Sequence, residues 1–131
     1  MINAKLAISN SKNKKDLSDR LLDFVVNVIK IADMLPNTVA GRHVTGQLIR
    51  AGTSSGSNYE EACGAESRSD FVHKMSIVLK ELKEARFWLR VIHRTGMLSA
   101  SDTEPAIDEC EQLCAIVAKS IITAKDRKRK G

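Results

Sequence analysis

A glycine- and serine-rich run at residues 51–57 (AGTSSGS) lies within an unbroken helical repeat. Alternating steps of four and three residues lead from Val44 along the series Leu48, Ala51, Ser55, Asn58 and Ala62. Residues separated by such steps lie on one face of a helix. The run is therefore predicted to be part of a helix whose inward face carries small residues, because a linker would have interrupted the repeat.

The same repeat marks four segments. They extend from about 16 to 35, from near 38 or 41 to 64, from 67 or 69 to 96, and from 101 or 103 to about 124. Pro36 ends the first segment, glycines end the second and third, and Ser67 or Ser69 caps the third. No alternating strand pattern is present. Helices of about 20 residues are roughly 30 Å long, and short turns between them predict an all-α, antiparallel up-down-up-down four-helix bundle.

The formal net charge of +5 lies at the two ends of the 131-residue chain. Residues 1–15 contain four lysines and no acid, and residues 125–130 contain five bases and one acid, which leaves residues 16–124 at −3. We therefore predict three parts: a flexible basic N-terminal arm at 1–15, the bundle at 16–124, and a basic C-terminal tail at 125–131. The two ends either bind an anionic partner or maintain solubility.

The chain has no segment suited to a membrane or to export. No stretch reaches the roughly 18 apolar residues of a membrane helix, and residues 1–10 do not follow a signal-peptide pattern. The three cysteines, Cys63, Cys110 and Cys114, are an odd number, which disfavours a disulfide framework. We expect a cytoplasmic protein with reduced thiols and no membrane partner. Cys110 and Cys114 lie on an apolar helical face, where cysteine fills a core.

Apolar residues on two segments exceed the needs of one small bundle. The first segment carries a second apolar series, Leu22, Val25, Ile29 and Ala32. The third carries a comparable series, Ile77, Trp88 and Val91. Surplus apolar surface usually contacts another chain, so a homo-oligomer is predicted. The alternative is a wide core face on a tightly packed helix.

Two glycines, Gly52 and Gly56, lie on the outer face of the second segment. Each glycine costs a helix about 1 kcal/mol relative to alanine. Close approach by another helix explains the presence of these two glycines better than flexibility does.

Four polar residues lie on or beside the predicted inner faces of the second and third segments: Ser55, Asn58, Glu61 and Glu84. A buried polar group without a partner costs about 1–3 kcal/mol. We therefore predict that these four side chains satisfy one another and fix the helix register. A di-iron site would need Glu-x-x-His motifs on facing helices, and none is present. No catalytic residue, metal site or cofactor is predicted.

Basic residues gather in two places. Steps of three and four residues place four of them along one side of the third helix: Lys83, Arg86, Arg90 and Arg94. The tail contributes five more: Lys125, Arg127, Lys128, Arg129 and Lys130. Such side chains neutralise phosphates or carboxylates, so nucleic acid or an acidic protein is the predicted partner. A solvated face, paired in part with Glu81 and Glu84, is the alternative for the helix.

Several motifs together resemble the 23S rRNA intervening-sequence-encoded family of four-helix-bundle proteins. They are LP at 35–36, QLIRAGTS at 47–54, NYEEA at 58–62, SRSDF at 67–71, and KELKE at 80–84 followed by WL at 88–89. The resemblance spans about residues 16–98 and implies an antiparallel bundle, frequently a ring-shaped homopentamer, with no established enzymatic activity. The accessory variability proteins of diversity-generating retroelements are similar pentameric bundles that engage a reverse transcriptase and nucleic acid.

These features favour a non-enzymatic, homo-oligomeric scaffold, with a pentamer favoured, that binds nucleic acid or a nucleic-acid enzyme such as a reverse transcriptase. A purely protein–protein interaction module is the first alternative. A HEPN-like ribonuclease is the second, because Arg68-x4-His73 and Arg86-x6-His93 match the loose arginine–histidine pattern of those helical enzymes. Neither pair comes with an identifiable nucleophile or acid–base partner.

Overall fold

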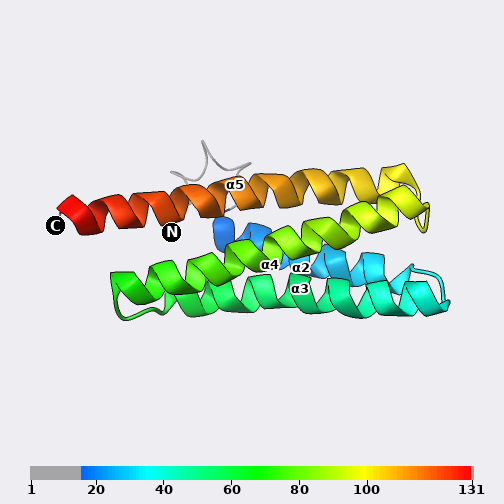
Figure 1. The fold of residues 1–131 in the computed structure, drawn as a ribbon, viewed down its shortest axis with the longest axis horizontal. Coiled ribbons are helices and arrows are strands. Elements are labelled where there is room, and N and C mark those ends of the chain that lie inside the picture. Colours follow the sequence, from blue (N-terminus) through cyan, green and yellow to red (C-terminus); the bar gives the residue numbers. More distant parts are fainter. Residues whose placement is uncertain (1–15, 131) are drawn as a thin grey trace.

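The computed structural model describes residues 16–130, and the side chains of residues 16–127. They form four helices: α2 (Leu17–Asp33), α3 (Val39–Cys63), α4 (Arg68–Thr95) and α5 (Ala100–Lys130). Successive helices run in opposite directions along one long axis (Figure 1). The predicted all-α, antiparallel four-helix bundle is confirmed, and no strand occurs within residues 16–130. In this part of the chain, no helix has the length and apolar character needed to cross a membrane.

Side-chain caps and one glycine set the helix ends. Ser67 Oγ accepts a hydrogen bond from the Asp70 N–H at 3.0 Å where α4 begins. Thr38 Oγ1 accepts one from the Gly41 N–H at 3.0 Å where α3 begins. Gly96 ends α4 in the left-handed conformation, with φ of 73°, which glycine adopts without a Cβ clash. The predicted start and end of this third segment are therefore confirmed.

The core is aliphatic and receives side chains from all four helices. Its large, fully buried members include Leu21, Ile31, Leu48, Met75, Leu82, Leu89, Ile92 and Leu113. Helix α4 packs against both α3 and α5, whereas α2 packs mainly against α3. Because α4 lies between two neighbours and buries one face, its opposite side is left for solvent or for partners.

Helix α3 approaches α2 closely at its two glycines. A Cβ atom at Gly52 would lie 2.8 Å from Val28 Cγ1, and one at Gly56 would lie 2.8 Å from Val25 Cγ2. Neither position has room for a side chain in a core packed at ordinary density. The close approach predicted from the sequence is confirmed, and the approaching helix is α2 of the same chain.

Helix α5 extends beyond the core. Its last buried side chain in the described part is Ala124, and the helix continues to Lys130 (Figure 1). Residues 125–130, predicted as a separate tail, continue α5. The predicted N-terminal arm, residues 1–15, lies outside the described residues, as does residue 131.

Candidate nucleic-acid interface

Four basic residues lie along one side of α4, beside the buried series that ends at Leu89 and Ile92. Lys83, Arg90 and Arg94 are exposed, and Arg86 is half-buried. We call these four residues the α4 basic face. Their spacing of three and four residues keeps them on one side over about three turns. The structure thus brings together the four residues that the sequence proposed on this helix.

The neighbouring carboxylates of α4 are held on the side toward α3. Arg50 Nη1 of α3 lies 3.1 Å from Glu81 Oε1, and Arg50 Nη2 pairs with Glu84 Oε2. The hydrogen bond from Arg50 lowers the pKa of Glu84 below its ordinary value of 4.5, with a smaller contribution in the same direction from Trp88. Glu81 and Glu84 therefore pair with Arg50 and not with the basic face, so the pairing part of the alternative is wrong, whereas its other part, a solvated face, stays a prediction.

The α4 basic face has no carboxylate partner in the part of the chain whose side chains the structure describes. Within residues 16–127, no ion pair includes Lys83, Arg86, Arg90 or Arg94. The sequence alone did not indicate Arg50, because its position opposite Glu84 depends on how α3 and α4 are aligned. An exposed group of like charges attracts anions and is screened by salt.

An aromatic cluster borders the basic face. The Phe87 side chain is 54% exposed, and its ring contacts Trp88 edge to face, with centroids 4.9 Å apart. Trp88 is half-buried, and the centroid of its ring lies 5.7 Å from that of His43 of α3. Its Nε1 donates a hydrogen bond to Glu84 Oε2 at 3.3 Å. A surface aromatic ring is thereby anchored beside cations. The sequence pattern does not reveal that Phe87 is exposed or that Trp88 supports it.

Ser55 and Asn58, predicted to bond with carboxylates, instead bond within α3. Ser55 is fully buried, and its hydroxyl donates to the Gly52 carbonyl at 2.7 Å. Asn58 is half-buried, and its Nδ2 donates to the Ser54 carbonyl at 2.9 Å. Short polar side chains in a helix readily reach the carbonyl three or four residues earlier, which explains why they need no partner on another helix.

Glu61 and Glu84, the other two residues of the predicted polar set, bond to bases. Glu61 is exposed, and its Oε1 lies 2.6 Å from Lys74 Nζ of α4. Glu84 is held by Arg50. The predicted mutual network of Ser55, Asn58, Glu61 and Glu84 is therefore wrong: two members bond locally, and two form ion pairs between α3 and α4.

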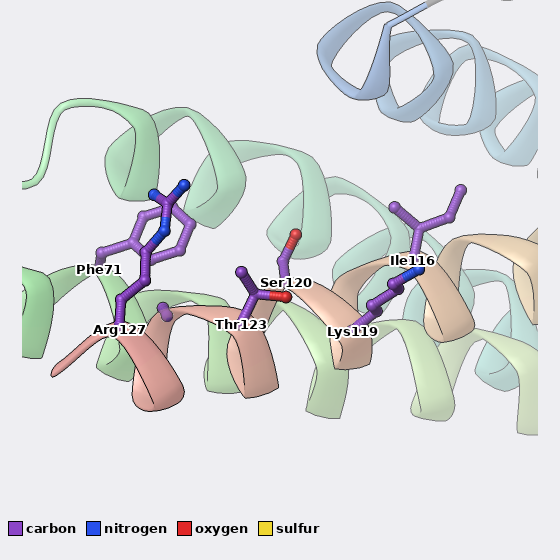
Figure 2. A pocket seen from close by; sticks show the side chains of 7 residues that line it. Phe71, Ile116, Lys119, Ser120, Thr123 and Arg127 are labelled. Atoms are coloured by element: carbon purple, nitrogen blue, oxygen red, sulfur yellow. The ribbon is translucent and has the colours of Figure 1, made fainter. Parts of the chain in front are cut away.

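The basic end of α5 lies at the opposite end of the bundle from Arg94. Lys125 and Arg127 are exposed, whereas the side chains of Lys128, Arg129 and Lys130 lie outside the described residues. Arg127 and Phe71 lie at one end of an open groove of about 430 Å³, which continues along α5 past Lys119 (Figure 2). Phe71 and Arg94 are separated by about 35 Å along α4, at 1.5 Å per residue. The two basic regions are therefore distinct surfaces.

The surplus apolar residues divide between the core and the surface. On α2, Leu22 and Ile29 are 61% and 41% exposed, with Val26 beside them, whereas Ala32 is buried. Val25 is half-buried, with a γ-methyl against Gly56. The series on α4, Ile77, Trp88 and Val91, is half-buried. An exposed apolar stripe thus remains on α2.

The cysteine pair of α5 lies in the core. Cys110 is fully buried and donates from Sγ to the Leu82 carbonyl at 3.2 Å, and Cys114 is buried one turn later. The neighbouring Cys110 thiol lowers the pKa of Cys114 to about 7, and the Cys114 thiol together with burial raises the pKa of Cys110. No group of three histidine, cysteine or acidic residues in the described chain could hold a metal ion.

The two histidines of the ribonuclease alternative do not share a site. His73 is exposed near the start of α4, whereas His93 lies near its end, with Nδ1 2.8 Å from the hydroxyl of the buried Thr103. Their positions are about 30 Å apart along the helix at 1.5 Å per residue. His93 therefore contributes to the packing of α4 against α5, and it lies too far from His73 for the two histidines to act in one site.

The sequence matches the family model of the 23S rRNA-intervening sequence proteins over residues 14–119. The chain belongs to this family. A solved structure with the same fold is that of a protein of unknown function from the S23 ribosomal protein family of Bacteroides thetaiotaomicron, with 30% sequence identity and a TM-score of 0.76. The match covers 81% of the present 23S rRNA-intervening sequence protein and 98% of the Bacteroides chain. A comparison with curated proteins finds no match. The family resemblance inferred from the sequence motifs is confirmed.

Proposed function

We propose that this 23S rRNA-intervening sequence protein is a non-enzymatic, homo-oligomeric scaffold that binds nucleic acid through the α4 basic face. The observation that carries the proposal is a set of four cations on one helix side, none of which has a carboxylate partner within residues 16–127. Cations that neutralise phosphates release counterions, which drives binding with little dependence on base sequence. Repetition of the face around an oligomer increases avidity.

The C-terminal end of α5 supports the proposal as a second contact. Lys119 and Arg127 project from α5 at the groove beside Phe71 (Figure 2). The segment 125–130 adds further bases to this end of the chain. A strand that contacts both regions must extend over about 35 Å, the length of the intervening part of α4. We expect the α5 end to supply the larger share of the electrostatic affinity, because it carries more cations.

The exposed stripe of α2 supports a protein–protein function beside the nucleic-acid function. Leu22, Val26 and Ile29 are each more than two-fifths exposed and lie on one side of the helix. Apolar stripes of this kind mark contacts between chains. Another copy of this chain is the favoured occupant, and a nucleic-acid enzyme such as a reverse transcriptase is the second candidate.

The test is fluorescence anisotropy with a labelled single-stranded RNA and a labelled DNA duplex over a range of salt concentrations. Arg90→Gln with Arg94→Gln removes two exposed charges from the basic face. If these residues contact phosphates of a single strand, the slope of log K against log salt falls by about 0.7 per lost contact. Deletion of residues 125–131 is expected to reduce the magnitude of this slope more than the Arg90/Arg94 variant does.

The matched control is Lys30→Gln with Lys74→Gln, which also removes two exposed or part-exposed charges but leaves the α4 basic face intact. Lys74 lies about 24 Å from Arg90 along α4, at 1.5 Å per residue. The control is expected to keep nearly the wild-type slope and affinity. Equal losses in the control and in the Arg90/Arg94 variant, or no binding by the wild type, would refute a nucleic-acid interface on this face.

A further inference from the structure

Phe87 is an exposed aromatic ring placed among the cations of the α4 basic face. Its side chain is 54% exposed, although burial of a phenylalanine side chain stabilises a protein. Lys83 lies one turn before Phe87, and Arg90 and Arg94 lie one and two turns after it on the same side of the helix. An apolar ring at this position contributes little to the core. Its surroundings combine a flat apolar surface with positive charge.

A shallow groove lies next to the ring. It has a volume of about 300 Å³, and α4 alone supplies its lining: Phe87, Arg90, Val91, Arg94 and Thr95. The Thr95 hydroxyl donates to the Val91 carbonyl at 2.8 Å, so this polar group already has a partner. The volume is at the lower end of the range for sites that hold small organic groups. The groove therefore offers a flat apolar wall and two guanidinium groups to a ligand.

The Phe87 ring is held in place by contacts with neighbouring side chains. Trp88 contacts it edge to face at 4.9 Å, with the ring planes at 78°. Trp88 is held in turn by its hydrogen bond to Glu84, and Glu84 is held by Arg50. This chain of contacts limits the motion of both aromatic side chains, which reduces the entropy lost when a ligand stacks on Phe87. Arg50 also holds the carboxylates of Glu81 and Glu84 on the side of α4 toward α3.

We infer that Phe87 and its groove form a stacking platform for an unpaired base, so that the α4 basic face selects single-stranded over duplex nucleic acid. The inference rests on the proposed function, whose cations would contact the flanking phosphates. Bases within a duplex stack on one another and cannot cover the Phe87 ring. Every base in a single strand has a free π-face, and stacking on an aromatic side chain tolerates any sequence.

The test compares four labelled probes of one length: single-stranded RNA, single-stranded DNA, an RNA duplex and a DNA duplex. Phe87→Ala is expected to weaken binding of the single strands by about 5- to 150-fold, the range for loss of one stacked base. Binding of both duplexes and the salt slope are expected to stay unchanged. Phe87→Leu keeps an apolar side chain without a π-face. Its affinity for the single strands is expected to lie between that of the wild type and that of Phe87→Ala.

Two further measurements complete the experiment. The chain contains a single tryptophan, Trp88, so its emission reports on a base that stacks beside it. Single strands are expected to change this emission in the wild type, and duplexes are not. Ile122→Ala is the matched control, because Ile122 is an exposed apolar residue of α5, at 59%, outside both grooves. This variant is expected to bind every probe as the wild type does.

The outcomes separate the inference from the proposed function. Unchanged single-strand affinity in Phe87→Ala, an equal loss on single strands and duplexes, or a wild-type preference for duplex would overturn the stacking platform. In each of these cases the salt-dependent binding through Arg90 and Arg94 would stand. Absence of salt-dependent binding to all four probes would overturn both. A difference between the RNA and DNA single strands would identify the preferred sugar and leave the inference intact.

Discussion

Gly52 lets α3 lie directly against Val28 of α2, and its replacement by alanine is the most direct test of this packing. An added Cβ would lie 2.8 Å from Val28 Cγ1 and 3.2 Å from both Cβ and Cγ2 of the same side chain. Val28 is fully buried and β-branched, so it has little freedom to turn away. Overpacking of this kind costs about 1–3 kcal/mol.

The matched control is on the same helix. Gly46 is exposed, and a Cβ atom there would meet nothing within 4 Å. Alanine improves helix propensity by about 1 kcal/mol at either position, so this term cancels in the comparison. Gly46→Ala is expected to stabilise the protein. Gly52→Ala is expected to be less stable than Gly46→Ala by about 1–3 kcal/mol, which is about 4–12 °C in Tm for a domain of this size.

Thermal unfolding followed by circular dichroism at one fixed protein concentration measures both variants, because association would make Tm depend on concentration. The double variant Gly52→Ala with Val28→Ala identifies the cause. Removing both γ-methyl groups leaves only Cβ near the new methyl group, so Gly52→Ala should then become neutral or favourable. Equal stabilisation by Gly52→Ala and Gly46→Ala in the wild-type background would refute the close contact of α3 with α2.

Two further predictions concern assembly and ion pairing. Light scattering after size exclusion is expected to give the mass of about five chains of 14.4 kDa, and Leu22→Ser with Ile29→Ser is expected to reduce it; a wild-type monomer would contradict this. Glu84→Gln is expected to lower Tm slightly at pH 7, since Arg50 lowers the pKa of Glu84 from 4.5 and the stabilisation exists only above that range. The difference should begin to shrink near pH 4.5 and vanish only below the lowered pKa of Glu84 in the folded protein, and a difference that persists below both pKa values would show another cause.

The positions of the helices were predictable because their signals are local. The repeat of three and four residues identified the inward face of α4, and Ser67 and Gly96 marked its ends. A cap or a left-handed glycine acts on backbone groups within one turn, so no distant contact is needed to recognise it. The tight approach at Gly52 was predictable for a related reason, because glycine in a helix interior costs stability that only close packing compensates.

Side-chain partners between helices could not be predicted in this way. Glu84 bonds to Arg50 and Asn58 bonds to its own helix, although their helical positions were equally compatible with a bond to each other. The sequence pattern also left open which members of the surplus apolar series are exposed, as Leu22 is and Ala32 is not, and it did not show that Trp88 supports Phe87. Helix periodicity defines the face of one helix only. The rotation and offset of α3 against α4 result from the packing of all four helices, and an offset of one turn exchanges every partner across the interface.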